Sequence, residues 1–305
     1  MADIQPHSPM TDIQTHPRFG EALVALDTGD LETLRALVAS DPALVHARTN
    51  LDESHGYFMG ATLLHHVAGN PDRGRLDGTR PALPPNDADL ARVLLDAGAE
   101  VDARTLGPRG GGTTMGLVLT SKQASDANLS GPLIDVLLAY GARLDVTKDD
   151  ALDGSLANHA PAAAEKLIAL GAKVDIFAAA GLGRMDWLQG CFDGEGRLLK
   201  RPRRGGSEMS ARDAIGLALL YAYVRHQTEA VDFLIEKDGN WNMVGVNNGT
   251  ALHRAAWAGD LQMVQRLVAK GADVNNRDNP FDGTPLDWAE HNNQQEVAQW
   301  LRSHR

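Results

Sequence analysis

The chain has 305 residues, of which 43% are hydrophobic and only 5% aromatic, and its formal net charge is −11. This acidity excludes a general role in nucleic-acid binding, because phosphate contacts require a stripe of clustered Lys and Arg. A single cysteine, Cys191, excludes an internal disulfide framework. No run approaches the roughly twenty apolar residues that span a bilayer, so we predict no membrane segment and a cytoplasmic location.

The chain begins with a polar segment, residues 1–16, that contains two prolines and has no apolar core of a signal peptide. We interpret it as a mobile tail and assign residues 17–305 to a single array. The first helical pattern runs over residues 19–41, where Gly29-Asp30 is typical of a break between two helices.

The same pattern of a turn, two short helices and a glycine recurs along the rest of the chain with varying regularity. The recognisable copies are residues 19–41, 61–102, 114–142, 156–175, the region around 180–184, 218–234, 248–278 and 282–301. A period of about 33 residues predicts a stack of helix pairs, each burying its apolar face against its neighbours.

Three insertions interrupt the pattern, at about residues 70–86, 122–130 and 193–210. Insertions in a repeat array fall on loops, often on the binding face. The third insertion concentrates positive charge in Arg197, Lys200, Arg201, Arg203 and Arg204. Two interpretations remain open: a solvated loop docked on acidic neighbours, or a docking site for an acidic partner or phosphate.

The most regular copy is residues 248–278, NGTALHRAAWAGDLQMVQRLVAKGADVNNRD. Thr250 is placed to cap a helix, and His253 to bond back to that cap as Glu does in a capping box. A second helix follows the break at Gly259, and Gly271 is placed to end it in the left-handed conformation.

This copy resembles the ankyrin repeat, with TALH at residues 250–253 and GADVN at residues 271–275. The resemblance implies an all-α solenoid of about eight helix-turn-helix units with a concave groove. It also implies a module for protein–protein recognition through that groove, without catalysis. We therefore expect a protein partner with basic or polar side chains, and neither nucleic acid nor membrane.

Side chains at the variable, groove-facing positions are the candidates for partner binding. Large or charged residues gather there in the last two repeats, and Trp and Arg are the residues that most often anchor interfaces. The candidates are Arg254, Trp257, Arg277, Asp278, Phe281, Asp287, Trp288, Glu290 and His291. The alternative is that Trp257 and Trp288 only close the last two repeats, whereas Trp241 is expected in the core.

Eleven histidines raise the question of chemistry. His65 and His253 both occupy the Thr-x-x-His position, where the family uses the ring to tie turns together. Neither His-x-x-x-His nor Cys-x-x-Cys spacing occurs, and the Gly-rich segment 107–114 lacks the Gly-Lys-Ser/Thr ending of a phosphate-binding loop. The sequence thus predicts no catalytic residues, metal or cofactor.

A second hypothesis is a small-molecule binder or atypical enzyme, in which the insertions close a pocket over the groove. The residues for such a pocket are Tyr57, Phe58, His66 and Arg109. Self-association through the aromatic C-terminal end is a third alternative, compatible with either function.

Overall fold

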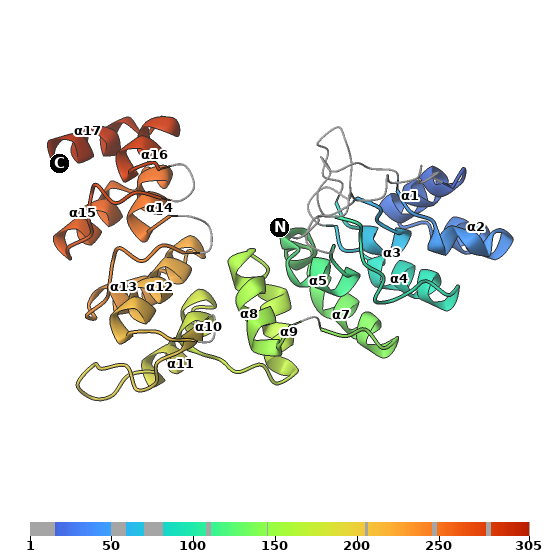
Figure 1. The fold of residues 1–305 in the computed structure, drawn as a ribbon, viewed down its shortest axis with the longest axis horizontal. Helices are drawn as coiled ribbons and strands as arrows, with labels where there is room; N and C mark the ends of the chain where they lie inside the picture. Colours follow the sequence, from blue (N-terminus) through green and yellow to red (C-terminus); the bar gives the residue numbers. More distant parts are fainter. Residues whose placement is uncertain are drawn as a thin grey trace, which may run out of the picture. The chain divides into compact units, whose positions relative to one another are not determined.

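A computed structural model describes residues 16–49, 59–69, 82–107, 111–144, 146–204, 207–245, 249–278 and 282–304. These residues form seventeen α-helices, one 3-10 helix and one two-stranded hairpin (Figure 1). The chain divides into two compact units, residues 1–172 and 173–305, here called the N-terminal and the C-terminal unit.

The N-terminal unit is a stack of four helix pairs. The first helices α1, α3, α5 and α8 contact one another in sequence order, and so do the second helices α2, α4, α7 and α9. The bounds are α1 Phe19–Thr28, α2 Leu31–Ser40, η1 Pro42–His46, α3 Leu63–His66, α4 Asp87–Asp96, α5 Thr114–Leu119, α6 Lys122–Asp126, α7 Ser130–Ala139, α8 Lys148–Ala157 and α9 Pro161–Ala169.

The C-terminal unit repeats this design with four more pairs. Its first helices α10, α12, α14 and α16 pack in sequence order, and among the second helices α11 contacts α13 and α15 contacts α17. The bounds are α10 Ile176–Gly181, α11 Met185–Gly190, β1 Arg203–Arg204, β2 Ser207–Glu208, α12 Ala211–Val224, α13 Thr228–Ile235, α14 Ala251–Ala258, α15 Leu261–Ala269, α16 Pro285–His291 and α17 Gln295–Ser303.

Eight helix pairs in the described residues confirm the predicted all-α array of helix-turn-helix units. The two degenerate copies, α10–α11 and α12–α13, stack like the others, since α12 contacts both α10 and α14. None of the helices in the described ranges is long and apolar enough to cross a membrane.

Aliphatic side chains of both the first and the second helices form the core, and leucines of the second helices are examples. Leu94 and Leu167 in one unit, and Leu234 and Leu267 in the other, are completely buried. Each buried leucine contributes roughly 1.5–3 kcal/mol through removal of apolar surface from water. Trp241 is also buried, as predicted.

The two Thr-x-x-His histidines tie consecutive turns together, as predicted. The Nδ1 atoms of His65 and His253 accept hydrogen bonds from the backbone N–H groups of Thr62 (3.1 Å) and Thr250 (3.2 Å). The proton therefore resides on Nε2, which donates to a carbonyl of the following turn, Ala103 in one case and Gly283 in the other. Burial disfavours the charged ring, so it lowers the pKa of His65 to about 4 and lowers that of His253 as well.

A polar amide side chain covers the glycine that ends the first helix in three repeats. Gly29, Gly183 and Gly259 all have positive φ angles, between 66° and 74°. A Cβ atom there would lie within 2.6 Å of a side-chain oxygen from the next repeat, so only glycine fits. The covering side chains are those of Asn86, Gln227 and Gln294, respectively.

The predicted tail, residues 1–16, lies outside the described residues except for His16, whose Nε2 is 3.0 Å from the Asp41 carboxylate. The insertion at 70–86 separates α3 from α4, and only its last residues are described. The insertion at 122–130 contains the short helix α6, and the one at 193–210 contains the β1–β2 hairpin.

Candidate functional site: an aromatic cluster in the C-terminal unit

The candidate site lies on the first helices of the last two repeats, α14 and α16. Two side chains from each helix meet there: Arg254 and Trp257 from α14, and Trp288 and His291 from α16. In each pair the residues are three positions apart, so they share one face of their helix. Because α14 and α16 pack side by side, the two faces combine into one surface, here called the aromatic cluster.

The rings of the aromatic cluster are in direct contact. The Trp257 and Trp288 ring centroids are 5.8 Å apart at an interplanar angle of 77°, an edge-to-face arrangement. The His291 ring stacks on Trp257 at 5.6 Å and 26°. The Arg254 guanidinium lies over the Trp288 ring, 5.1 Å from its centroid, in a cation–π contact. Each ring thus restrains its neighbour.

Trp257 and His291 are the exposed members of the aromatic cluster. Arg254 and Trp288 are half-buried, whereas 40% of Trp257 is accessible to solvent. Partial burial lowers the pKa of Arg254, although its guanidinium stays charged at neutral pH. The surface therefore combines an exposed indole with a cation held beside it, the residue types that dominate binding energy at protein interfaces.

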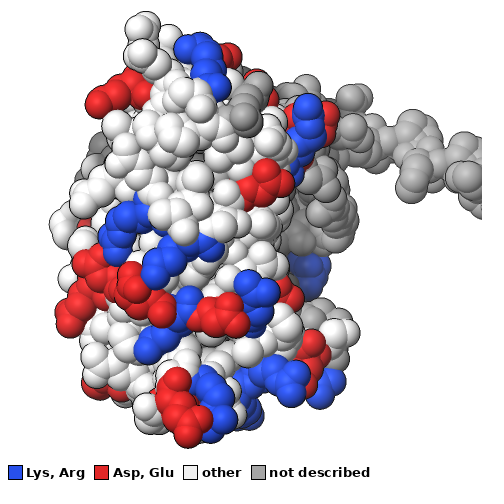
Figure 2. All heavy atoms as spheres, turned by 90° about the vertical axis from the view of Figure 1, so that its left-hand side faces the viewer, with Lys and Arg blue, Asp and Glu red and all other residues white. Residues whose placement is uncertain are grey.

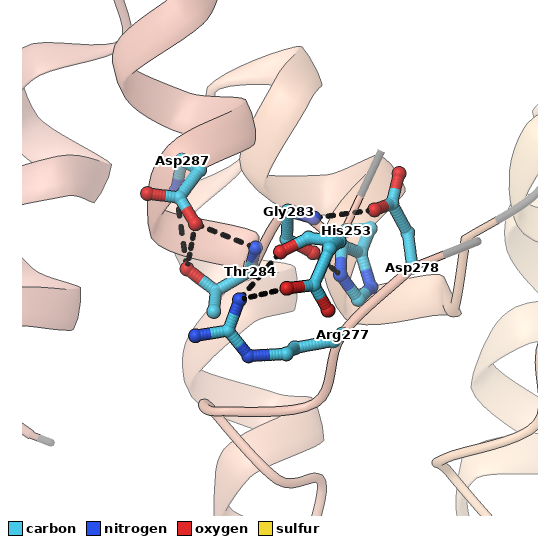
Figure 3. Close-up of polar contacts among 7 residues, drawn as sticks. His253, Arg277, Asp278, Gly283, Thr284 and Asp287 are labelled. Carbon is cyan, nitrogen blue, oxygen red and sulfur yellow. Dashed lines mark hydrogen bonds and ion pairs between the residues drawn. The ribbon is translucent and has the colours of Figure 1, made fainter. Parts of the chain in front are cut away.

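Trp288 is fixed by the turn that precedes its own helix. Its Nε1 donates to Asp278 Oδ2 over 3.1 Å, and Asp278 Oδ1 accepts from the Gly283 N–H over 2.6 Å. On the other side, the His253 ring packs edge-to-face against the indole at 5.2 Å. Figure 3 shows Gly283 between His253 and Asp278, bonded to both. The buried Asp278 thus orients Trp288 from below the surface.

Other predicted partner-binding residues border the aromatic cluster and have partners of their own. Arg277 donates from Nη1 to the carbonyl of Asp282 over 2.6 Å and to its carboxylate over 2.9 Å. Asp287 accepts from the N–H and hydroxyl of Thr284 at 2.7 Å and so caps α16. Glu290 accepts from Arg302 at 2.7 Å. Phe281 lies outside the described residues.

One residue of this site, Asn292, was not identified from the sequence. Its Nδ2 donates to the Trp257 carbonyl over 2.7 Å, which joins the end of α14 to the end of α16. Polar amide side chains recur at the ends of first helices in this chain, directly before a residue in the left-handed conformation. That position in the sequence was the signal that could have identified Asn292. Asn292 keeps the two halves of the aromatic cluster in register.

Of the four residues predicted to line a small-molecule pocket, only His66 lies among the described residues. His66 is buried, with its ring 5.9 Å from that of Phe19 in an edge-to-face contact. Tyr57, Phe58 and Arg109 lie outside the described residues. A groove of about 730 Å³ does lie between α2 and α4, but its walls come from the second helices, including Arg35, Val38, Arg92 and Asp96. The described residues also contain no group of three His, Cys, Asp or Glu side chains that could hold a metal ion.

Comparison with known proteins agrees with the helix pairs and their turns. A family model for ankyrin repeats, spanning three copies, matches residues 197–278 and 219–305. Residues 197–305 thus match the ankyrin-repeat family, and ankyrin repeats are generally protein–protein interaction modules.

Among solved structures, the human ASB11 ankyrin repeat domain is similar to this chain at 18% sequence identity and a TM-score of 0.41. The match covers 93% of this chain and 97% of that domain. A search of curated proteins found no match.

Proposed function

We propose that the C-terminal unit binds a partner protein on the face formed by its first helices, without catalysis, and that the aromatic cluster anchors the partner. The observation that carries the proposal is Trp257, an indole that is 40% exposed although its neighbours Trp288 and His291 hold its ring. Trp and Arg are enriched among the residues that dominate binding energy at interfaces, and here they lie together in one surface cluster.

The restraint on Trp257 favours tight binding. Ordering a free side chain at an interface costs about 0.5–1.5 kcal/mol, and a ring already held by its neighbours avoids most of that cost. Covering the indole then removes apolar surface from water, and Arg254 supplies donors beside it. An anchor of this kind typically contributes about 2 kcal/mol or more.

The net charge of the C-terminal unit favours neither an acidic nor a basic partner. Residues 173–305 contain 17 acidic and 16 basic side chains, so this unit is close to neutral in a protein whose net charge is −11. Figure 2, which faces the side that carries α13 and α15, shows acidic and basic side chains interspersed over that surface. Recognition at the aromatic cluster therefore depends on short-range packing, and the expected preference for a basic partner does not extend to this unit.

The test is affinity capture from a native lysate, with bound proteins identified by mass spectrometry and their affinities then measured. Wild type is compared with Trp257→Ala and with a control, Trp300→Ala. Trp300 lies in α17, outside the aromatic cluster, and its ring stacks on that of His304, just after the helix. We expect Trp257→Ala to weaken the captured partner about 30-fold, equivalent to roughly 2 kcal/mol, while Trp300→Ala retains it. Equal affinities for wild type and Trp257→Ala, with unchanged circular dichroism, would contradict the proposal.

The small-molecule alternative is not proposed. Of its four residues only His66 is described, and that ring packs in the core beside Phe19. The 730 Å³ groove involves none of them.

A further inference from the structure

The insertion at residues 193–210 has a backbone fixed by its own hydrogen bonds. At its start, Asp193 Oδ1 accepts from two backbone N–H groups, and the Leu199 N–H donates to the Cys191 carbonyl over 2.9 Å. Further on, Arg203 pairs with Glu208 in the β1–β2 ladder. The segment extends past the ends of the neighbouring helices (Figure 1). We call residues 197–204 together with 207 and 208 the basic hairpin.

The basic hairpin combines an exposed apolar side chain with several cations. Leu199 is 64% exposed, which makes it the most exposed of the large hydrophobic residues that the structure describes. Lys200, Arg201 and Arg203 follow it and are all exposed. A leucine surrounded by cations at the end of a fixed loop suits a partner surface that is apolar at its centre and acidic around it.

Neighbouring carboxylates neutralise the basic hairpin only in part. Arg197 pairs with Asp193 and with Glu195, both at 2.9 Å, as the interpretation of a solvated loop predicts. Arg201 lies 3.6 Å from Glu208, and both side chains are more than half exposed. Lys200 has no ion pair or hydrogen bond with any described residue. Positive charge therefore remains beside Leu199.

The N-terminal unit carries a surface with the opposite charge around a similar apolar residue. Val146 is 53% exposed in the turn before α8, and the exposed Asp149 and Asp150 follow it. Between them, Lys148 directs its Nζ to the Leu170 carbonyl at 2.5 Å, just beyond the end of α9, which leaves the turn acidic. We call residues 146–150 the acidic turn. The whole N-terminal unit has 23 acidic and 13 basic residues.

We propose that the basic hairpin of one chain binds the acidic turn of a second copy of this chain. Leu199 packs on Val146, and Lys200 and Arg201 lie beside Asp149 and Asp150. The two surfaces differ, so the contact is head-to-tail, and each added copy leaves one free surface of each kind. The proposal is independent of the aromatic cluster, which contributes no residue to this contact.

The test is sedimentation of the full chain over a range of concentrations at about 50 mM and about 500 mM salt, since the higher ionic strength shortens the screening length to a few ångströms. We expect the average mass to rise with concentration at low salt and to return to that of one chain at high salt. The variant Lys200→Glu/Arg201→Glu should weaken association at least about tenfold, and so should Asp149→Lys/Asp150→Lys. Mixing the two variants places opposite charges at every contact between unlike copies, because the hairpin of either variant then faces a turn of the opposite charge on the other. Association should therefore return in the mixture, with the two variants alternating head to tail.

Two controls separate charge from damage to the fold. Arg212→Glu makes a similar charge change in α12, where Arg212 pairs with Asp238 outside both surfaces, and should associate like wild type apart from its net charge. Asp149→Asn/Asp150→Asn removes the acidic charge without placing cations at the start of α8, and should also weaken association. A mass of one chain at every concentration in low salt overturns the proposal, as does association that neither reversal weakens or that mixing fails to restore.

Discussion

The two units share one architecture and differ in surface chemistry. Each stacks four helix pairs around a core of aliphatic side chains from both helices of each pair. The N-terminal unit has an excess of ten acidic residues and no tryptophan, whereas the C-terminal unit is nearly neutral and holds all five tryptophans. The buried positions, where Leu and Ala recur in both, define the stack, so the variable positions can adapt each unit to a different kind of contact.

First helices vary in length in both units. In the N-terminal unit α3 has four residues and α5 has six, and the insertion at 70–86 follows the shorter one. In the C-terminal unit α10 has six residues and α12 has fourteen, whereas α14 has eight between a capping threonine and a left-handed glycine. The family model matches residues 197–305, which include α14, while the N-terminal unit outside the match still stacks its helix pairs in sequence order.

The tryptophan distribution provides a way to measure the two units separately. Indole fluorescence reports only on the C-terminal unit, since residues 1–172 contain no tryptophan. Circular dichroism reports on the helices of both. Two substitutions and one change of pH should each shift the fluorescence transition and the circular dichroism transition to different extents.

Gly216→Ala should destabilise the C-terminal unit by at least about 3 kcal/mol. Gly216 lies inside α12, and a Cβ atom there would be 1.9 Å from the Asn240 carbonyl oxygen. That backbone cannot easily withdraw, because the Asn240 N–H is bonded to the Arg212 carbonyl at 2.8 Å. In urea, the fluorescence transition should shift to lower concentration, and an unchanged midpoint would show that α12 can move away from the turn.

Acidification should affect the N-terminal unit more strongly. The pKa of His65 is about 4 in the folded protein against 6.5 for an unperturbed ring, so between these values only the unfolded chain takes up the proton. Stability is therefore complete above about pH 6.5 and falls as the pH decreases towards 4, by on the order of 3 kcal/mol. Urea unfolding by circular dichroism from pH 7 to 5 measures this loss. The His65→Gln variant should show a smaller pH dependence than wild type, and equal slopes would exclude His65 as the cause.

Gly154→Ala should stabilise the N-terminal unit slightly, by roughly 0.5–1 kcal/mol. Gly154 is in the interior of α8, and a Cβ atom there would meet nothing within 4 Å. The circular dichroism transition should move to higher urea while the fluorescence transition stays in place. A shift in both signals would mean that the two units unfold together.

Much of the fold was predictable because it depends on local patterns. Thr250 and His253 specify a cap through their spacing alone, and the same holds for Thr62 and His65. The geometry of the candidate site depends on contacts between repeats. The bond from Trp288 to Asp278 and the stacking of His291 on Trp257 follow from how α14 and α16 pack, which spacing within one helix does not reveal. The hairpin at 203–208 was missed for a related reason, since a two-residue strand in a charged loop leaves no clear periodicity.

The contact between a glutamine and the glycine that ends a first helix bears on how the number of repeats in such a chain can change. Gln227 covers Gly183 where the fifth repeat meets the sixth, and Gln294 covers Gly259 where the seventh meets the eighth. Both boundaries thus pair a left-handed glycine with a glutamine from the next repeat. At the boundary between the sixth and seventh repeats, His226 occupies the position of the glycine. An in-frame deletion of the sixth and seventh repeats would place Gly183 under Gln294. The new boundary would then have the same glycine–glutamine contact that the chain already has at two boundaries.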